Sequence, residues 1–391
     1  MFKAKWTLLL YMFIGAQWVV AEDAKQPVDT FAQVGENIAA AFNSGDAHRL
    51  GEQYDFHELG LRALKTMGIN DGESSEFGKG FLKGFEGKGA ATYLARTVDS
   101  IARSKGSAKF IRVANQDGER RVLVRFDLGE NGFDYAEFLV RQQKSGEYRI
   151  VDSFVLSQGQ LLSVVLGAAA RLMSDPNPTV LEMLFGVHSF DKNVLGQILA
   201  LNELERNGKF KEAIAALDRM PKEISGSKLF MQKRVSYANM TQDVPLYREA
   251  LAKLAASYGD DPTTSFLLID YYFYQGDLDK ALHGVSLMES RVGVDGVTEQ
   301  LRATLYFSKA MYNEGFAHAR ESIRLEPDRQ DMYWLLALNY IHAGQFKNAI
   351  TIYQMVEKRF DYPLDSAGFK DKPEMKVFVA SPEFKKWMRG K

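Results

Sequence analysis

The second half of this 391-residue chain repeats one short pattern at a fixed interval. Tyr272, Tyr306 and Tyr340 follow one another at a spacing of 34 residues. Three glycines are spaced by twice that interval: Gly208, Gly276 and Gly344. An apolar residue stands two positions after each glycine, and an alanine followed by an apolar residue stands five positions after it. Glycine can end a helix in a left-handed turn, and a small alanine lets a second helix approach the first. The pattern therefore predicts a stack of helix–turn–helix units.

This pattern resembles the tetratricopeptide repeat (TPR). Alignment on the repeated residues gives about five units, at 194–229, 231–261, 262–295, 296–329 and 330–363. Two units depart from the pattern, because Pro245 stands at the expected turn glycine of the second and Ala310 at that of the fourth. We expect a TPR-like solenoid over 179–370, closed by a C-terminal cap at 371–391.

The TPR resemblance implies that the first helix of each unit lines a concave groove that holds a protein or peptide partner. By family position the groove residues are Phe266, Asp270, Phe273, Tyr274, Phe307, Trp334, Leu338, Ile341 and His342. Aromatic side chains in a groove are suited to anchoring a peptide. The alternative is that some of these residues pack between units, or that the N-terminal half covers them.

The N-terminal half changes its hydrophobic period near residue 108. Residues 27–105 have helical spacing, whereas 108–155 alternate and contain turn sequences such as Glu130-Asn131-Gly132. This order predicts an α+β domain, with about three helices followed by a four-stranded antiparallel sheet. Together with the Asn43-Ser44-Gly45-Asp46 turn, it resembles the NTF2-like (cystatin-like cone) superfamily over 27–160. A bridging helix and linker are expected at 161–178, where Pro176 and Pro178 mark a boundary between two separable folding units.

The NTF2-like resemblance implies a possible pocket inside the cone, which some members use for a ligand or for proton transfer. The residues that could line such a pocket here are His57, Asp134, Tyr135 and Asp152. The competing interpretation is that these are ordinary exposed or strand-edge polar residues, since their spacing matches no enzyme motif. A small-ligand-binding protein or a simple acid–base enzyme is therefore one alternative function.

The first 21 residues have the order of a secretory signal peptide. Lys3 and Lys5 precede an apolar run, and Val19-Val20-Ala21 provides small or modest residues before a cleavage site. The run is shorter than the roughly 20 residues that a membrane span needs. We expect cleavage after Ala21, a mature protein in the periplasm or secreted, and no transmembrane segment in it.

Composition excludes several kinds of chemistry. The chain has no cysteine, which removes disulfides, thiol nucleophiles and cysteine-ligated metals. Its 49 basic and 50 acidic residues balance, so nothing favours binding to nucleic acid. The six histidines are scattered, and the glycine-rich stretch Gly78–Gly89 lacks the Ser or Thr of a phosphate loop, so no metal or cofactor is expected. The sequence favours an exported, non-enzymatic adaptor or scaffold; an envelope or polysaccharide assembly component is a further alternative.

Overall fold

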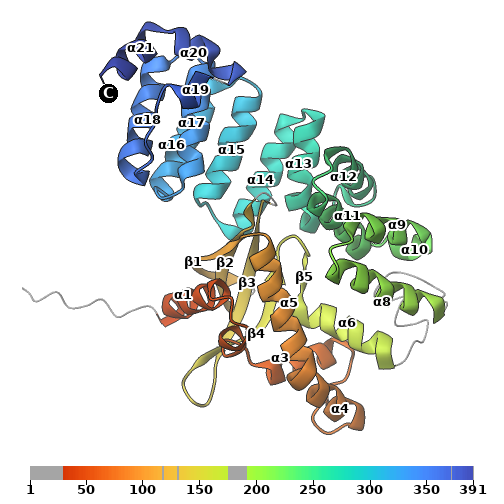
Figure 1. The fold of residues 1–391 in the computed structure, drawn as a ribbon. Coiled ribbons are helices and arrows are strands. Elements are labelled where there is room, and N and C mark those ends of the chain that lie inside the picture. The colour runs from red at the N-terminus through yellow and green to blue at the C-terminus, as the bar shows by residue number, and fades with distance from the viewer. Residues whose placement is uncertain (1–29, 117–118, 130–131, 175–191, 371, 391) are drawn as a thin grey trace, which may run out of the picture.

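A computed structural model describes residues 30–116, 119–129, 132–174, 192–370 and 372–390. An antiparallel sheet with helices occupies residues 30–174, the sheet half, and residues 192–390 form an entirely helical half. Figure 1 shows the helices of the second half following one another in a curved row above the strands. The predicted signal peptide at 1–21 and the prolines Pro176 and Pro178 lie outside the described residues.

Five helices precede the sheet, with bounds α1 Thr30–Asn43, α2 Ala47–Gly51, α3 Phe56–Thr66, α4 Glu76–Gly84 and α5 Ala90–Arg103. Side chains cap three of them, since Asp46, Asp55 and Ser75 each accept a hydrogen bond from a backbone N–H in the first turn. The glycine-rich stretch lies in α4 and in the π-helical turn Phe85–Gly89 that continues it. It is helix rather than a phosphate-binding loop.

The sheet is a meander of five strands in the order β1-β2-β3-β4-β5, every pair antiparallel. Their bounds are β1 Ser107–Gln116, β2 Glu119–Asp127, β3 Phe133–Gln142, β4 Tyr148–Val155 and β5 Gln160–Leu161. The predicted antiparallel sheet is confirmed, but the predicted number of four strands is wrong. The fifth strand has only two residues, which is too short to give an alternating pattern.

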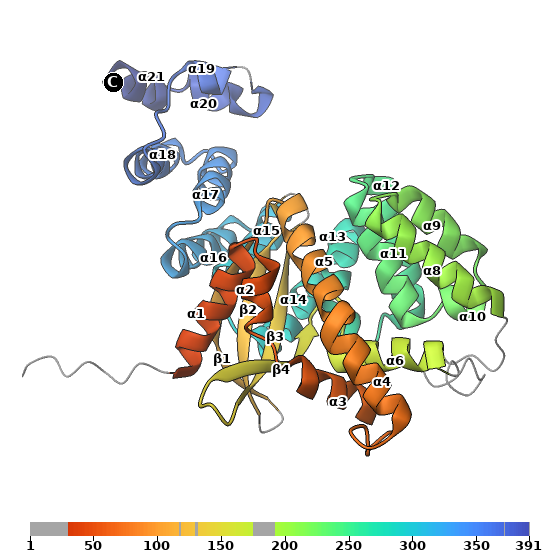
Figure 2. The same cartoon turned by 60° about the horizontal axis from the view of Figure 1, so that its bottom comes forward.

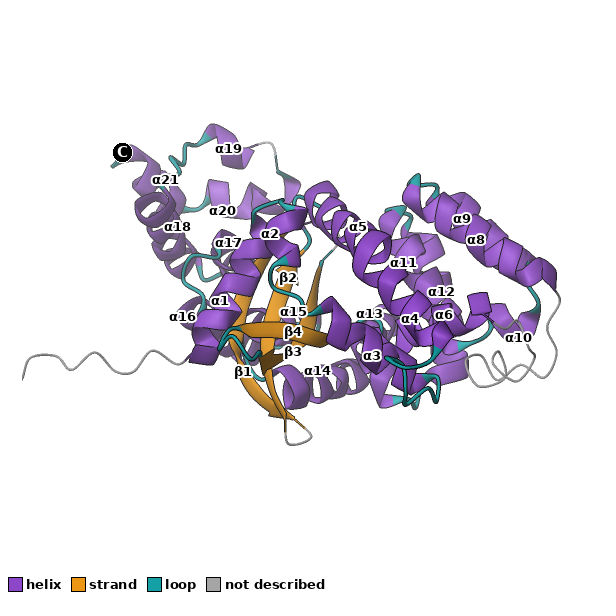
Figure 3. Ribbon diagram, turned by 90° about the horizontal axis from the view of Figure 1, so that it is seen from below, coloured by secondary structure: helices purple, strands orange, loops and turns teal. Residues whose placement is uncertain are grey.

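The two faces of the sheet are covered by different parts of the chain. The inner face packs on α1, α2 and α5 and contributes apolar side chains such as Val122, Val124 and Phe138 to one buried cluster. α6 (Leu162–Ser174) crosses part of the outer face and contacts α3 and β4. Figure 3 shows α1 and α14 on opposite sides of the strands, so the rest of the outer face meets the helical half.

Successive helices of the second half pack on one another along the chain. Their bounds are α8 Lys192–Arg206, α9 Phe210–Arg219, α10 Lys222–Ser225, α11 Lys228–Met240, α12 Val244–Tyr258, α13 Ser265–Gln275, α14 Leu278–Val292, α15 Gly296–Ser308, α16 Tyr312–Leu325, α17 Gln330–His342 and α18 Phe346–Phe360. Three short helices follow: α19 Ala367–Lys370, α20 Lys376–Ala380 and α21 Pro382–Arg389. Figure 2 shows this end lying away from the sheet, and Phe378, Phe384 and Trp387 pack there against Tyr353 of α18 and Phe369 of α19.

Five turns between paired helices contain a residue with positive φ, and these residues are spaced by 34 along the chain. They are Gly208 (φ 67°), Gln242 (φ 56°), Gly276 (φ 74°), Ala310 (φ 55°) and Gly344 (φ 70°). Ala310 stands where the sequence alignment places it. Pro245 does not, because it lies in the first turn of α12 and Gln242 takes the left-handed position instead.

Replacing Gln242 or Ala310 by glycine should stabilise the protein. A non-glycine residue in the left-handed region carries a steric cost of roughly 1 kcal/mol, part of which glycine recovers. We expect Ala310→Gly and Gln242→Gly each to raise the free energy of unfolding by about 0.5 kcal/mol in urea titrations. Gly344→Ala is the matched control, since an added Cβ there meets nothing within 4 Å, and it should cost about 1 kcal/mol through backbone strain alone. Destabilisation by both glycine variants would contradict the turn assignment.

Candidate functional site

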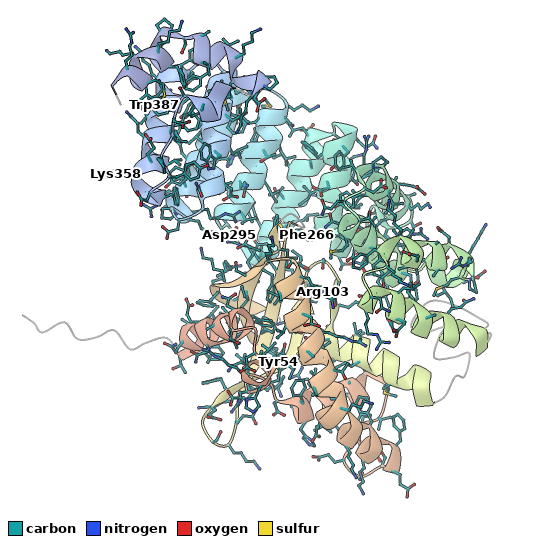
Figure 4. The ribbon with its side chains drawn as sticks, viewed as in Figure 1. Tyr54, Arg103, Phe266, Asp295, Lys358 and Trp387 are labelled. Atoms are coloured by element: carbon teal, nitrogen blue, oxygen red, sulfur yellow. The ribbon has the colours of Figure 1, made fainter. Side chains whose placement is uncertain are left out.

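The outer face of the sheet meets the helices α13, α14 and α15 and the end of α16 in a buried contact, called here the junction. Its apolar part joins Leu123, Tyr135 and Phe154 of the strands to Ile269, Val285, Met288 and Leu305 of the helices. Phe133 of β3 packs edge-on against Phe266 of α13, with ring centroids 5.6 Å apart. Figure 4 shows Phe266 and Asp295 where the strands reach the helical half.

Arg125 of β2 is the centre of a charged cluster in the junction. Its side chain is 1% exposed and donates to Asp295 at 2.8 Å and to Glu326 at 2.6 and 2.8 Å. Tyr135 donates its hydroxyl to the same Asp295 oxygen, and Lys109 donates to Glu326 at 2.9 Å. Burial alone would raise the pKa of Glu326, but the hydrogen bonds from Arg125 and Lys109 outweigh it and lower the pKa to about 2. The Glu326 carboxyl group is therefore ionised at neutral pH.

The two carboxylates of this cluster also complete helix ends. Asp295 caps α15 by accepting from the backbone N–H groups of Val297 and Thr298, each at 2.9 Å. Glu326 follows the last residue of α16 and accepts from the backbone N–H of Gly296 at 3.0 Å. Arg125 thus binds groups that are already fixed by two successive helix connections, which limits the side-chain entropy lost on pairing.

A second buried ion cluster in the junction is centred on Glu137 of β3. Glu137 of β3, 3% exposed, accepts two hydrogen bonds from Arg291 of α14, at 2.5 and 3.0 Å. Glu137 also accepts from Arg121 of β2 at 3.0 Å, and the Arg291 guanidinium lies 3.6 Å from the ring centroid of Phe154. Fork-shaped pairing of this kind fixes orientation as well as distance. The two clusters together fix the position of the sheet relative to the helices.

The predicted groove residues of α13 divide between the junction and solvent. Phe266 faces β3 and is part of the junction, as the covered-groove alternative expects. Asp270, Phe273 and Tyr274 are exposed, with Phe273 and Tyr274 at 38% and 36%. Their rings lie 5.7 Å apart, and the guanidinium of Arg248 on α12 lies 5.2 Å from the Tyr274 centroid. Tyr247 of α12 donates its hydroxyl to Asp270 at 2.8 Å.

The groove residues of α15 and α17 are mostly internal. Phe307 and Ile341 are buried, at 9% and 5% exposed, so the structure places them in the core between helices and not on a surface for a partner. Leu338 and Trp334 are partly buried, and Trp334 packs between Tyr353 and Tyr362 with centroids 5.5 and 5.7 Å away. His342 is exposed and borders an open hollow of about 550 Å³ beside Met311 and Tyr312. The nine residues therefore do not form one continuous aromatic surface.

The four predicted cone residues lie in separate places, and together they do not line a pocket within the cone. His57 is on the surface of α3, where Glu86 and Glu73 accept its hydrogen bonds at 2.7 and 3.1 Å and raise its pKa. Tyr135 belongs to the junction. Asp152 is fully buried at the outer face and accepts from the hydroxyl of Ser163 at 2.6 Å, beside the start of α6. Asp134 accepts from the hydroxyl and backbone N–H of Ser157. Because successive side chains on a strand point to opposite faces of the sheet, Tyr135 and Asp152 lie on the face opposite the helices α1 and α5.

Apolar side chains fill the space between the inner face and its helices. Phe42, Leu50 and Tyr54 are among the buried members of this cluster. Tyr54 and Tyr93 approach each other with hydroxyl oxygens 3.4 Å apart, and burial raises the pKa of both. These hydroxyls are neutral at physiological pH.

Asp134 gives a pH-dependent prediction. Burial raises the pKa of Asp134 to about 6, although hydrogen bonds from Ser157 and the Tyr135 backbone oppose the rise. A carboxyl with a raised pKa is destabilising when ionised, so its cost appears as the pH rises from about 4 through 6. The stability of Asp134→Asn relative to wild type should therefore increase by about 1–2 kcal/mol between pH 4 and pH 8. Asp279→Asn, on an exposed position of α14, should show no such trend; an equal trend in both variants would refute the assignment to Asp134.

The sequence did not indicate the charged residues of the junction. Arg121, Arg125 and Glu137 alternate with apolar residues on their strands, and this pattern is typical of a face exposed to solvent. Their partners Arg291, Asp295 and Glu326 are more than 150 residues away along the chain. The Asp295-x-x-Thr298 capping pattern could have located the start of α15, but nothing local indicates its second partner.

The chain matches no protein-family model and no curated protein sequence. Among the described residues, no group of three or more His, Cys, Asp or Glu side chains could hold a metal ion. A search of the same residues finds no helix with the length and apolar character needed to cross a membrane.

Proposed function

We propose that this chain is an exported adaptor that binds another protein through the exposed surface of α12 and α13, and that it is not an enzyme. The observation that carries the proposal is the pair Phe273 and Tyr274, two adjacent aromatic rings left exposed at the end of α13. Large aromatic side chains held by their neighbours lose little entropy on binding and often dominate an interface. The adjoining residues Arg248 and Asp270 would supply polar contacts at its edge.

The scaffold that presents this surface is proposed to be a TPR-like array. Five left-handed turns at intervals of 34 residues, each between two packed helices, support this interpretation. The sheet half is proposed to be NTF2-like, on the basis of its helices and curved meander. Because its inner space is filled and its outer face is docked, we assign it a supporting role for the array.

Site-specific crosslinking tests the proposed surface. A photoreactive phenylalanine analogue is placed at Phe273 in the full chain, and crosslinked proteins from an envelope extract are identified by mass spectrometry. The matched control places the analogue at Val377, which is 69% exposed on α20. We expect a defined partner at Phe273 only, and at least a tenfold loss of its copurification when Phe273→Ser is combined with Tyr274→Ser. Equal crosslinking from both positions, or none from Phe273, would remove the α12–α13 surface from consideration.

Export is the second part of the proposal, and it rests on the residues Lys3 to Ala21. Intact-mass analysis of the protein from the producing cells should show Glu22 as the first residue. Full-length protein retained in the membrane fraction would contradict export by a cleaved signal.

A further inference from the structure

An open cleft of about 1020 Å³ lies on the sheet half, between α3, α6 and the adjoining ends of β2 and β3. Its lining includes four partly exposed apolar side chains, Leu61, Ile69, Leu161 and Val164. The remaining lining is charged or polar and includes Arg62 and Asp71. This cleft borders the junction through Leu161 and shares no lining residue with the α12–α13 surface.

Arg62 of α3 is a cation without a hydrogen bond at this cleft. Its side chain is 22% exposed, and its closest carboxylate oxygens are 3.4 Å away on Glu58 and 3.9 Å away on Glu119 and Asp152. Its buried Nε has no hydrogen-bond partner among the described residues. A guanidinium presents a planar fork of donors that matches a carboxylate. The buried Nε is out of reach of a ligand, but the terminal amino groups are 3.9 Å from the nearest carboxylate oxygens, so a ligand carboxylate can accept hydrogen bonds from them.

The surrounding carboxylates restrict the kind of anion that can reach Arg62. Glu58 and Glu119 are shared with Arg141, at 3.6 and 3.3 Å, and Asp152 is held by Ser163. Their negative charge opposes a bare anion. Asp71 lies at the exposed edge of the cleft, and its carboxylate makes no hydrogen bond or ion pair with the described residues. It is suited to a ligand ammonium group.

We propose that this cleft binds a small zwitterion with a branched apolar group, of the class of an apolar amino acid or a short apolar peptide. The ligand carboxylate pairs with Arg62, its ammonium pairs with Asp71, and its apolar part contacts the side chains of Leu61, Ile69, Leu161 and Val164. The two opposite charges of the ligand match Arg62 and Asp71, two of the eight charged side chains that line the cleft, and the apolar group distinguishes the ligand from a simple salt. The proposal is independent of the adaptor function.

Calorimetric titration of the full chain tests the ligand class. The probes are leucine, leucyl-leucine, 4-methylpentanoate (which lacks the ammonium), 3-methylbutylamine (which lacks the carboxylate) and inorganic phosphate. We expect leucine or leucyl-leucine to bind at least about tenfold more tightly than the other three. Equal binding of 4-methylpentanoate or phosphate would make this a simple anion site and overturn the proposal. Failure of both zwitterions to bind would overturn it as well.

Variants then test the two charged contacts. Arg62→Met and Asp71→Asn should each weaken binding of the zwitterion by about tenfold or more, whereas Lys79→Met, at an exposed position of α4 outside the cleft, should leave it unchanged. Asp71 is exposed, so its variant remains informative even if Arg62→Met fails to fold. Unchanged affinity in Asp71→Asn, or in a folded Arg62→Met, would overturn the assigned contacts.

Discussion

Arg125→Met should lower the free energy of unfolding by about 3–5 kcal/mol, because it leaves Asp295 and Glu326 buried without their principal cation. Methionine keeps much of the side-chain volume, so the loss reports the charge and its hydrogen bonds more than a cavity. Urea unfolding followed by circular dichroism measures the change. Lys109→Met removes another cation from Glu326, but that side chain is 50% exposed, and its loss should cost less than about 1 kcal/mol. Equal costs for the two variants would show that the Arg125 cluster does not stabilise the junction.

Glu137→Leu should have the second-largest effect, a loss of about 3 kcal/mol. Removing this buried carboxylate leaves Arg121 and Arg291 close together without the partner that both share. Adding Arg291→Met removes one of the two cations that the Glu137 carboxylate had bound, and we expect the double variant to recover at least about 1 kcal/mol.

The control for that double-mutant cycle is the exposed pair Glu147 and Arg149, which is 2.8 Å apart. Glu147→Leu with Arg149→Met should give a coupling energy below about 0.5 kcal/mol. If Glu137 and Arg291 couple no more strongly than this surface pair, the fork between β3 and α14 does not position the sheet.

The local structure was largely predictable from the sequence because local signals determine it. Gly208, Gly276 and Gly344 mark helix ends through a conformation that glycine adopts without strain. Gln242 was missed because glutamine does not favour the left-handed conformation, so its residue type gives no signal for the turn. The first four strands show their alternation, whereas the two-residue β5 has none to show.

The candidate site was only partly predictable. The sequence shows which residues share a face of a strand or helix, but it does not show which other part of the chain covers that face. Alternation on β2 predicts that Arg121 and Arg125 share one face, but not whether water or protein covers it. Phe266 and Phe273 both fit a groove position by spacing, yet only the docked sheet separates the covered ring from the exposed one. Tertiary contacts between residues far apart in the sequence make this distinction.

The same contacts bear on the predicted independence of the two halves, which stays a prediction. Leu123 and Phe154 share one apolar cluster with Val285 and Leu305, so separating the halves would expose that surface to water. Cleavage of the linker near Pro178 and persistence of the junction are therefore compatible outcomes, since the halves could remain associated after the chain is cut.

The central claim is that the sheet half is docked on the helical half and leaves the end of α13 free. An engineered disulfide tests it most directly, because the chain has no cysteine of its own. A Cβ placed on Gly159, in the turn before β5, would lie 3.2 Å from the Cβ of Thr263, beside the start of α13. A shift of a few tenths of an ångström brings this pair to the roughly 3.5–4.5 Å that a disulfide requires, and the left-handed backbone of Gly159 adds a modest strain to the cysteine there. Gly159→Cys combined with Thr263→Cys should form this bond under mild oxidation in the folded full chain, as read by mass spectrometry of its peptides, whereas each single variant should keep a free thiol. Two free thiols in the folded, oxidised double variant would contradict the docking and the assignment of surfaces that depends on it.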